Sequence, residues 1–225
     1  MNTIEYHMEC NFTFRHYRDI ILLAKKKGYT FSTFNDYDHN KSKRRLILLR
    51  HDVDINLINA LKLAKIENKL GAVSTFFIRL HAPFNVFSYD NYPILKKIIN
   101  LSHEIGLHYE QDFFTILNEK NIIQTFNRER SVLENIINKK ISGISIHEPN
   151  RSFNKLASDR LLLKKLKLKY CTYQPKFVKE IKYISDSGGR WREGCLCEFI
   201  KKNKPKLSVL IHPIWWFNKS PIENY

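Results

Sequence analysis

The sequence is poor in the residues that mark several specialised classes of protein. Its 225 residues include only 7 glycines, 7 prolines and 4 cysteines. The longest apolar stretches, such as Leu46 to Leu49, fall far short of the ~20 residues that a membrane-spanning helix needs. These shortages exclude a fibrous or disordered chain, a disulfide framework and a transmembrane helix. With 43% hydrophobic residues, the composition is that of a globular protein.

Acidic residues are also scarce, with 22 Asp and Glu against 38 Lys and Arg, so the net charge is +16. Such a charge attracts nucleic acid, anionic lipid, phosphorylated metabolites or acidic glycans. The lysine runs at residues 164–169 and 201–206 contain no stacking aromatics and accompany no nucleic-acid motif. We therefore interpret them as solvated surfaces and rank nucleic-acid binding last among the functional hypotheses.

The cysteines and the N-terminal residues carry little signal. Cys195 and Cys197 are spaced as CxC without a second cysteine pair, and Cys10 and Cys171 are distant in sequence, so the pattern does not favour a zinc site. The first residues, MNTIEYHMECNFTF, include acidic side chains and no apolar core, unlike a secretory signal. We expect a cytoplasmic protein.

Helices and strands alternate along the chain. No repeat or linker interrupts it, and we expect residues 1–225 to form a single domain. Apolar residues at spacings of three or four predict an amphipathic helix over residues 12–27, and residues 34–45 read as a polar connector. The predicted strands are 46–49, 72–78, 104–107, 143–146, 169–172, 181–184 and 207–211, and the further helices are 56–70, 93–101, 119–138, 154–166 and 193–202. This order predicts a mainly parallel sheet or barrel.

Chemically versatile residues follow five of the predicted strands. They are the HDVD of residues 51–54, His108 with Glu110, His147 with Glu148, Asp186 and His212. Because the carboxyl ends of parallel strands meet on one face of a barrel, we expect these residues to form one cluster.

The cluster has the composition of a hydrolytic metal site. Asp54, His108 and His147 offer one carboxylate oxygen and two imidazole nitrogens, a set suited to Zn²⁺ or a similar divalent ion. Asp52 lies two residues before Asp54 on the same side of an extended chain, where it can act as a base. His212 can donate a proton to a leaving group.

The ordered segments LRHDVD, STFFI, HEIGLHYE and VLIHP resemble the NodB-type polysaccharide deacetylase superfamily, carbohydrate esterase family four in the broad sense. The segments SIHEP, DSGGRWREG and HPIWW are similar to a subgroup found in bacterial surface-polysaccharide biosynthesis. The resemblance covers residues 46–217. It implies an α/β fold, a distorted (β/α) barrel here preceded by the amphipathic helix, and metal-dependent removal of an N-acyl group, usually acetyl, from an amino sugar.

The resemblance also implies roles for individual residues. Asp52 would be the general base, Asp54 and His108 metal ligands, and His212 the general acid. The late motif implies that Asp186 orients His212 and that Arg190 pairs with Asp52. A plain loop-stabilising ion pair is the alternative interpretation of Asp186 and Arg190.

One departure concerns the third ligand. The family usually has a second histidine four residues after the first, but this chain has Asp112 there. We expect His147 to replace it, with Asp112 and then Glu110 as alternatives, and loss of metal and catalysis as the remaining one. The two leading functional hypotheses are thus a deacylase acting on an amino sugar carried on a nucleotide or lipid phosphate, and an inactive glycan-binding or assembly module.

Other conspicuous residues are predicted to be structural. His51 should alternate away from Asp52, and His103 should pack near a turn. Trp215 and Trp216 are interpreted as core residues in preference to a sugar-stacking wall. Arg50 and Glu148 are candidates to contact and orient the residues of the site.

Overall fold

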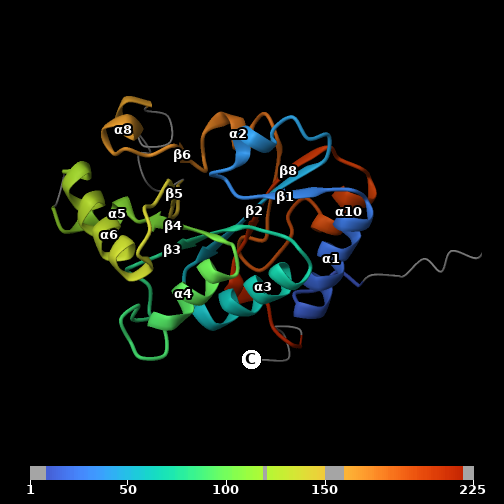
Figure 1. The fold of residues 1–225 in the computed structure, drawn as a ribbon, viewed down its shortest axis with the longest axis horizontal. Helices are drawn as coiled ribbons and strands as arrows, with labels where there is room; N and C mark the ends of the chain where they lie inside the picture. Colours follow the sequence, from blue (N-terminus) through green and yellow to red (C-terminus); the bar gives the residue numbers. More distant parts are fainter. Residues whose placement is uncertain (1–8, 119–120, 150–159, 220–225) are drawn as a thin grey trace, which may run out of the picture.

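The computed structural model describes residues 9–118, 121–149 and 160–219 (Figure 1). Within them, eight strands form one sheet in the order β6-β5-β4-β3-β2-β8-β7, with β1 beside β2. The strands are β1 (Thr30–Ser32), β2 (Leu46–Val53), β3 (Thr75–Ile78), β4 (Glu104–Tyr109), β5 (Gly143–Ile146), β6 (Tyr170–Cys171), β7 (Lys182–Ser185) and β8 (Lys206–Ile211). Every pairing between them is parallel.

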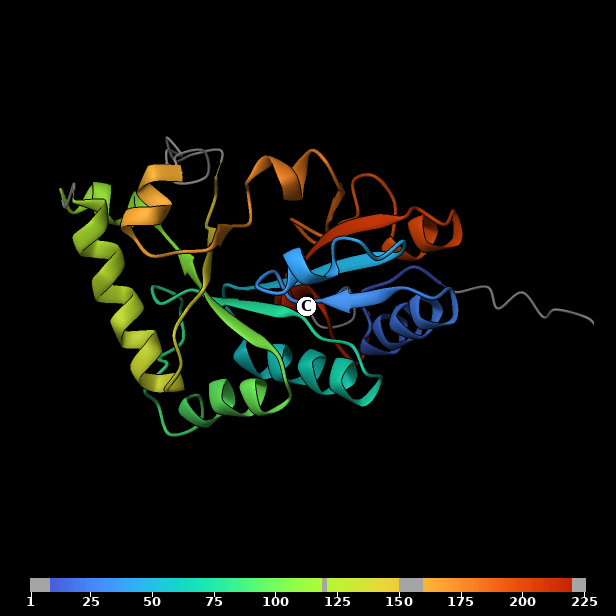
Figure 2. The ribbon, with the colours of Figure 1, turned by 45° about the horizontal axis from the view of Figure 1, so that its top comes forward.

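Helices surround this sheet, which curves into a half-barrel (Figure 2). They are α1 (Phe14–Lys26), α2 (Tyr37–Asn40), α3 (Leu57–Lys69), α4 (Tyr92–Asn100), α5 (Gln111–Ile116), α6 (Ile122–Ile137), α8 (Arg160–Lys165), α9 (Pro175–Val178), α10 (Leu196–Lys201) and the 3-10 helix η1 (Pro213–Trp215). The architecture confirms the predicted α/β fold and distorted barrel. No helix in the described ranges is long and apolar enough to cross a membrane.

Side-chain caps start several of the predicted helices. Thr13 accepts a hydrogen bond from the His16 amide at the start of α1, and Asn56 accepts one from the Asn59 amide at the start of α3. After α1 the chain reverses at Gly28, whose φ of +78° favours glycine. The first part of the predicted helix 154–166 falls outside the described residues, and α8 begins at Arg160.

Strand β2 lies at the centre of the sheet and is buried along its whole length. One edge pairs with β8, and the other pairs first with β1 and then with β3. The prediction ended this strand at Leu49, which is wrong: it continues through Arg50, His51 and Asp52 to Val53. The sequence suggested an end because charged residues interrupt the apolar run, yet each of them has a partner in the fold.

Alternation along β2 separates two apolar environments. Leu46 and Leu48 pack with Phe77 and Tyr170 in one cluster, whereas Ile47 and Leu49 pack against α1 and α10 residues in another. Arg50 and Asp52 therefore point to the side of Leu46 and Leu48, and His51 points to the helix side. Close approach on the first side depends on glycine, because a Cβ at Gly106 or Gly143 would collide with the Phe77 or Tyr170 ring.

Strand β1 and helix α2 were not predicted. The sequence of residues 34–45 is polar, but Tyr37 of α2 is buried against Phe177. The three residues of β1 become a strand only because Leu46, Ile47 and Leu48 offer them a paired edge. These elements depend on tertiary contacts and not on local preference.

Candidate active site

The carboxyl ends of neighbouring strands bring the predicted site residues together. Asp54 follows β2 and His147 follows β5, while His108 is the last residue but one of β4. Asp186 and His212 follow β7 and β8 in the same way. Since all these strands are parallel, the side chains converge at one rim of the half-barrel.

Asp54, His108 and His147 form a group whose ligand atoms all lie within 4.8 Å of one another. The Nε2 atom of His108 is 3.2 Å from Oδ1 of Asp54. The two imidazole rings lie edge to face, with centroids 5.2 Å apart. The Nδ1 atom of His108 lies 3.2 Å from the carbonyl oxygen of Ser145, so a proton on Nδ1 leaves Nε2 as a ligand.

The oxygens of this cluster fit a divalent cation. Oδ1 of Asp52 is buried and has no hydrogen-bond partner among the described residues, and the buried Oδ1 of Asp54 faces only the imidazole of His108. A buried carboxylate oxygen without a donor is costly, and a bound cation would satisfy it. Two imidazoles with one carboxylate suit Zn²⁺ and leave a coordination position open. Which ion binds stays a prediction.

Among the three candidates for the third ligand, the geometry favours His147. Asp112 lies in α5 and is not part of the group. Glu110 receives two hydrogen bonds from Arg79, of 2.9 and 2.7 Å, and its Oε1 is 3.5 Å from Nδ1 of His147. The Glu110 carboxylate is therefore engaged by the Arg79 guanidinium and is placed to orient the His147 ring, which makes it a poorer candidate for the third ligand.

Without a metal, the charges in the cluster shift the pKa values of Asp54 and His108. Burial alone would raise the pKa of Asp54, but the hydrogen bond and charge of His108 lower it to about 2. Burial alone would lower the pKa of His108, whereas the carboxylates of Asp52 and Asp54 raise it overall. These carboxylates therefore favour the protonated form of His108 in the metal-free site, and cation binding, which needs the neutral ring, competes with that protonation.

Asp52 is 2% exposed and is held through one oxygen only. Its Oδ2 accepts hydrogen bonds from Nη2 of Arg50 at 3.0 Å and from Oγ of Ser145 at 3.2 Å. Arg50 is fixed in turn by Oη of Tyr173 at 2.8 Å. The predicted pairing of Arg190 with Asp52 is wrong, because Arg190 is exposed and makes no such ion pair in the described structure.

The pairing of Arg50 with Asp52 could have been predicted from the sequence. Arg50 is two residues before Asp52, and alternate residues of a strand share a face. Ser145 and Tyr173 lacked such a signal, because only the parallel pairing of β4 with β5 and the turn after β6 bring them near.

His212 and Asp186 form a closely bonded pair. Nδ1 of His212 is 2.6 Å from Oδ1 of Asp186, and the backbone amide of His212 donates to both carboxylate oxygens. Nε1 of Trp216 donates to Oδ2 at 3.0 Å. Asp186 thus fixes the ring of His212 and turns Nε2 toward the cluster, 4.0 Å from Oδ2 of Asp54.

Asp186 also sets the charge of His212. Burial would lower the pKa of His212, but the charge and hydrogen bond of Asp186, with smaller contributions from Asp52 and Asp54, raise it to about 9. In the metal-free protein His212 is therefore protonated at neutral pH, as a proton donor must be.

A cavity of about 360 Å³ is connected to the Asp52 network through a shared residue, Tyr173. Tyr173, which holds Arg50, lines it together with Pro149, Tyr183 and Ser185. Its walls combine aromatic faces and hydroxyl groups with the charged side chains of Arg192 and Glu193, groups that can stack on a sugar ring and hydrogen-bond to it.

His51, His103 and Trp216 are structural, as predicted, whereas Trp215 is only half-buried. Nε2 of His51 is 2.6 Å from Oε1 of the fully buried Glu67 on the helix side of β2. His103 lies 3.0 Å from the Ala64 carbonyl oxygen. Trp216 is fully buried against Tyr17, so it is a core residue.

No protein-family model and no curated protein matches the sequence. Among solved structures, the chain is similar to IcaB from Ammonifex degensii, with 15% identity, a TM-score of 0.52 and coverage of 89% of this chain and 84% of IcaB. It is similar to the chitin deacetylase of Colletotrichum lindemuthianum, with 14% identity, a TM-score of 0.51 and coverage of 77% and 75%.

A wild-type CE4 family pseudoenzyme from Bacillus anthracis is a further structure with this likeness, at 17% identity, a TM-score of 0.52 and 76% coverage of this chain. The present chain spans 56% of that protein's length. At such identities the comparisons concern the fold, and the chain has the fold of the CE4 polysaccharide deacetylases, in agreement with the motifs in its sequence.

Proposed function

We propose that the chain is a metal-dependent carbohydrate N-deacylase, which hydrolyses an N-acyl group, in the first instance N-acetyl, on an amino sugar. One observation carries the proposal. At a single rim of the sheet, a ligand set of Asp54, His108 and His147 lies between an anchored carboxylate, Asp52, and a protonated imidazole, His212. Metal-dependent amide hydrolysis by general acid–base catalysis uses these three components together.

The position of each group in the site determines its proposed role in hydrolysis. A divalent ion held by the ligand set would supply Lewis acidity toward the amide carbonyl and the attacking water. Asp52 has Oδ2 fixed by Arg50 and Ser145, so its free Oδ1 is the atom that accepts a proton from water. His212, oriented through Nδ1 by Asp186, donates a proton from Nε2 to the departing amine nitrogen.

The substrate is proposed from the cavity and the net charge. The aromatic and hydroxyl-lined cavity beside Arg50 suits a pyranose ring. The net charge of +16 suits an amino sugar carried on a nucleotide or lipid phosphate. We assign the protein to the assembly of bacterial surface polysaccharides, which the resemblance of its motifs supports, and we propose that it acts in the cytoplasm.

The test is acetate and amine release from a panel of N-acetylated amino sugars, free and nucleotide-linked, by protein loaded with Zn²⁺ and quantified for metal. Asp52→Asn should keep its metal and lose ~10²-fold or more in turnover. Asp112→Asn is the matched control, a carboxylate near the site but outside the ligand group, and should keep both. A metal-loaded wild type that releases no acetate from any sugar would contradict the proposal.

A second candidate function, a non-catalytic glycan-binding module, is supported by one contact and one comparison. The buried ion pair with Arg50 holds the carboxylate proposed as the base, and a CE4 pseudoenzyme has the same fold. This candidate predicts sugar binding without turnover, with the same affinity in wild type and Asp52→Asn. Equilibrium dialysis with the sugars of the panel separates the two candidates.

A further inference from the structure

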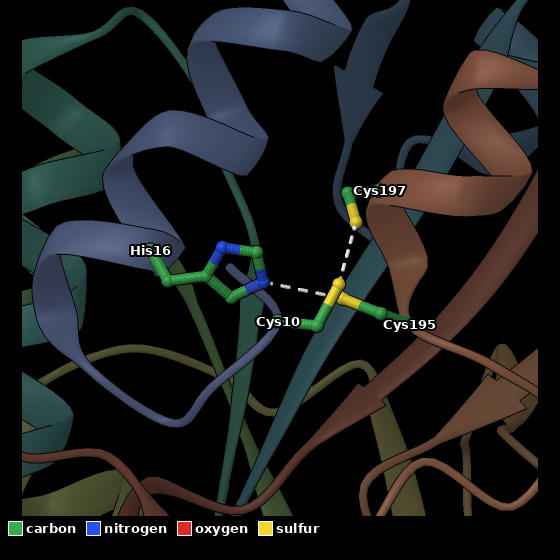
Figure 3. A group of neighbouring side chains, drawn as sticks. All are labelled: Cys10, His16, Cys195 and Cys197. Carbon is green, nitrogen blue, oxygen red and sulfur yellow. Dashed lines mark hydrogen bonds between the residues drawn. The ribbon is translucent and has the colours of Figure 1, made fainter. Parts of the chain in front are cut away.

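A second group of metal-binding side chains lies away from the proposed active site. Cys10, His16, Cys195 and Cys197 have ligand atoms that all lie within 4.8 Å of one another. Figure 3 shows the four side chains turned toward a common centre between α1 and α10. None of them belongs to the cluster at the strand ends.

The four residues come from two parts of the chain that are far apart in sequence. Cys10 precedes α1 and His16 lies in its first turn, while Cys195 is the N-cap of α10 and Cys197 lies within that helix. The exposed Cys10 covers three residues that are 3% exposed or less. The sequence showed only the CxC pair, so the pattern did not favour a zinc site, and folding supplies the other two ligands.

The ligand atoms are gathered as a tetrahedral ion requires, slightly closer together than a bound zinc would hold them. Zn²⁺ bound to sulfur at about 2.3 Å and to nitrogen at about 2.0 Å holds neighbouring ligand atoms about 3.6 to 3.8 Å apart. Here Sγ of Cys10 and Sγ of Cys197 are 3.3 Å apart, and Nε2 of His16 is 3.2 Å from Sγ of Cys195. All four cysteines of the chain lie in described residues, and none forms a disulfide bond.

We propose that Cys10, His16, Cys195 and Cys197 bind a second Zn²⁺ in a closed structural site. Three thiolates and one imidazole fill the tetrahedral coordination, so no position is left for water or substrate. The soft sulfur ligands distinguish this site from the oxygen- and nitrogen-containing group of Asp54, His108 and His147.

The ion would fasten the N-terminal segment and α1 to α10. This region lies behind the proposed general acid, because His16 stacks on Trp216 and Trp216 donates to Asp186. Backbone hydrogen bonds of Phe12 and Phe14 with Phe217 already hold the segment that carries Cys10 and His16, so these two ligands lie beside the cysteines of α10 before the ion arrives. Binding to the folded chain alone would stabilise it by mass action.

Metal counting tests the proposal independently of catalysis. The background is His108→Ala, which disables the other site. Protein purified without chelator should contain one equivalent of zinc, and Cys10→Ser or Cys197→Ser in this background should contain none. Cys171→Ala, which removes the buried cysteine of β6 outside the group, should retain it. Chelation should lower the Tm of the background by ~5 °C or more and leave that of the Cys10→Ser variant unchanged.

Cobalt substitution of the wild type covers the case in which a variant fails to fold. The expected spectrum has thiolate-to-cobalt charge-transfer bands in the near ultraviolet and the intense visible bands of a tetrahedral ion. Protein that binds neither zinc nor cobalt through sulfur would overturn the proposal. A Cys10–Cys197 disulfide found by mass spectrometry in protein prepared under reducing conditions would also overturn it.

Discussion

The pairing of Asp186 with His212 gives the sharpest prediction. Asp186→Asn removes the charge that contributes most to raising the pKa of His212 from its ordinary 6.5 to about 9. That difference corresponds to roughly 3 kcal/mol at about 1.36 kcal/mol per pH unit. Because burial still opposes the charged ring, the pKa of His212 should fall by ~2 pH units or more in the variant.

The consequence for activity has a definite sign. His212 acts as an acid, so turnover requires its protonated form and is lost as the pH rises through its pKa. The alkaline limb of kcat/KM should therefore move to lower pH in Asp186→Asn. The stability that His212 contributes is present in full below about pH 6.5 and is lost as the pH rises through about 9, so the variant should also lose this dependence.

Two measurements check this prediction: the pH profile of kcat/KM for the metal-loaded enzyme, and titration of the His212 ring by NMR in the metal-free protein. Trp216→Phe is the control, because it removes one donor to Asp186 and some packing but keeps the carboxylate charge. It should lower Tm and leave the His212 titration in place. An alkaline limb that stays at the wild-type position in Asp186→Asn would refute the role of this carboxylate.

Three further predictions follow from the same contacts. His147→Ala should weaken zinc binding at the active site by more than ~100-fold, measured by competition with a chelating dye, whereas Asp112→Ala should not. In metal-free protein, Asp54→Asn should lower the free energy of unfolding by roughly 2 kcal/mol at neutral pH, because the pKa of Asp54 is held near 2. This contribution is present above pH 3.8 and vanishes as the pH falls through about 2, so urea denaturation over that range checks it. Glu67→Ala should cost ~3 kcal/mol or more in the same assay, since it leaves His51 buried without its partner, and wild-type stability would contradict it.

Much of the fold follows from local patterns. The spacing of apolar residues located α1, α3, α4 and α6 within a few residues, and runs of β-branched and aromatic residues located most of the strands. The strand order of the sheet was not accessible in this way. Parallel pairing joins segments separated by many residues, and the register depends on side chains that meet only after folding.

By itself, the sequence determined which chemically versatile residues lie at or near the carboxyl ends of strands, and with a parallel sheet this was enough to gather Asp52, Asp54, His108, His147 and His212 at one rim. The tertiary structure decided which side chains form pairs. Arg50 and not Arg190 reaches Asp52, because a strand carries alternate residues on one face while the loop after β7 leaves Arg190 in solvent. It also decided that Cys10 and His16 join a CxC pair about 180 residues away, a proximity created by the packing of α1 on α10.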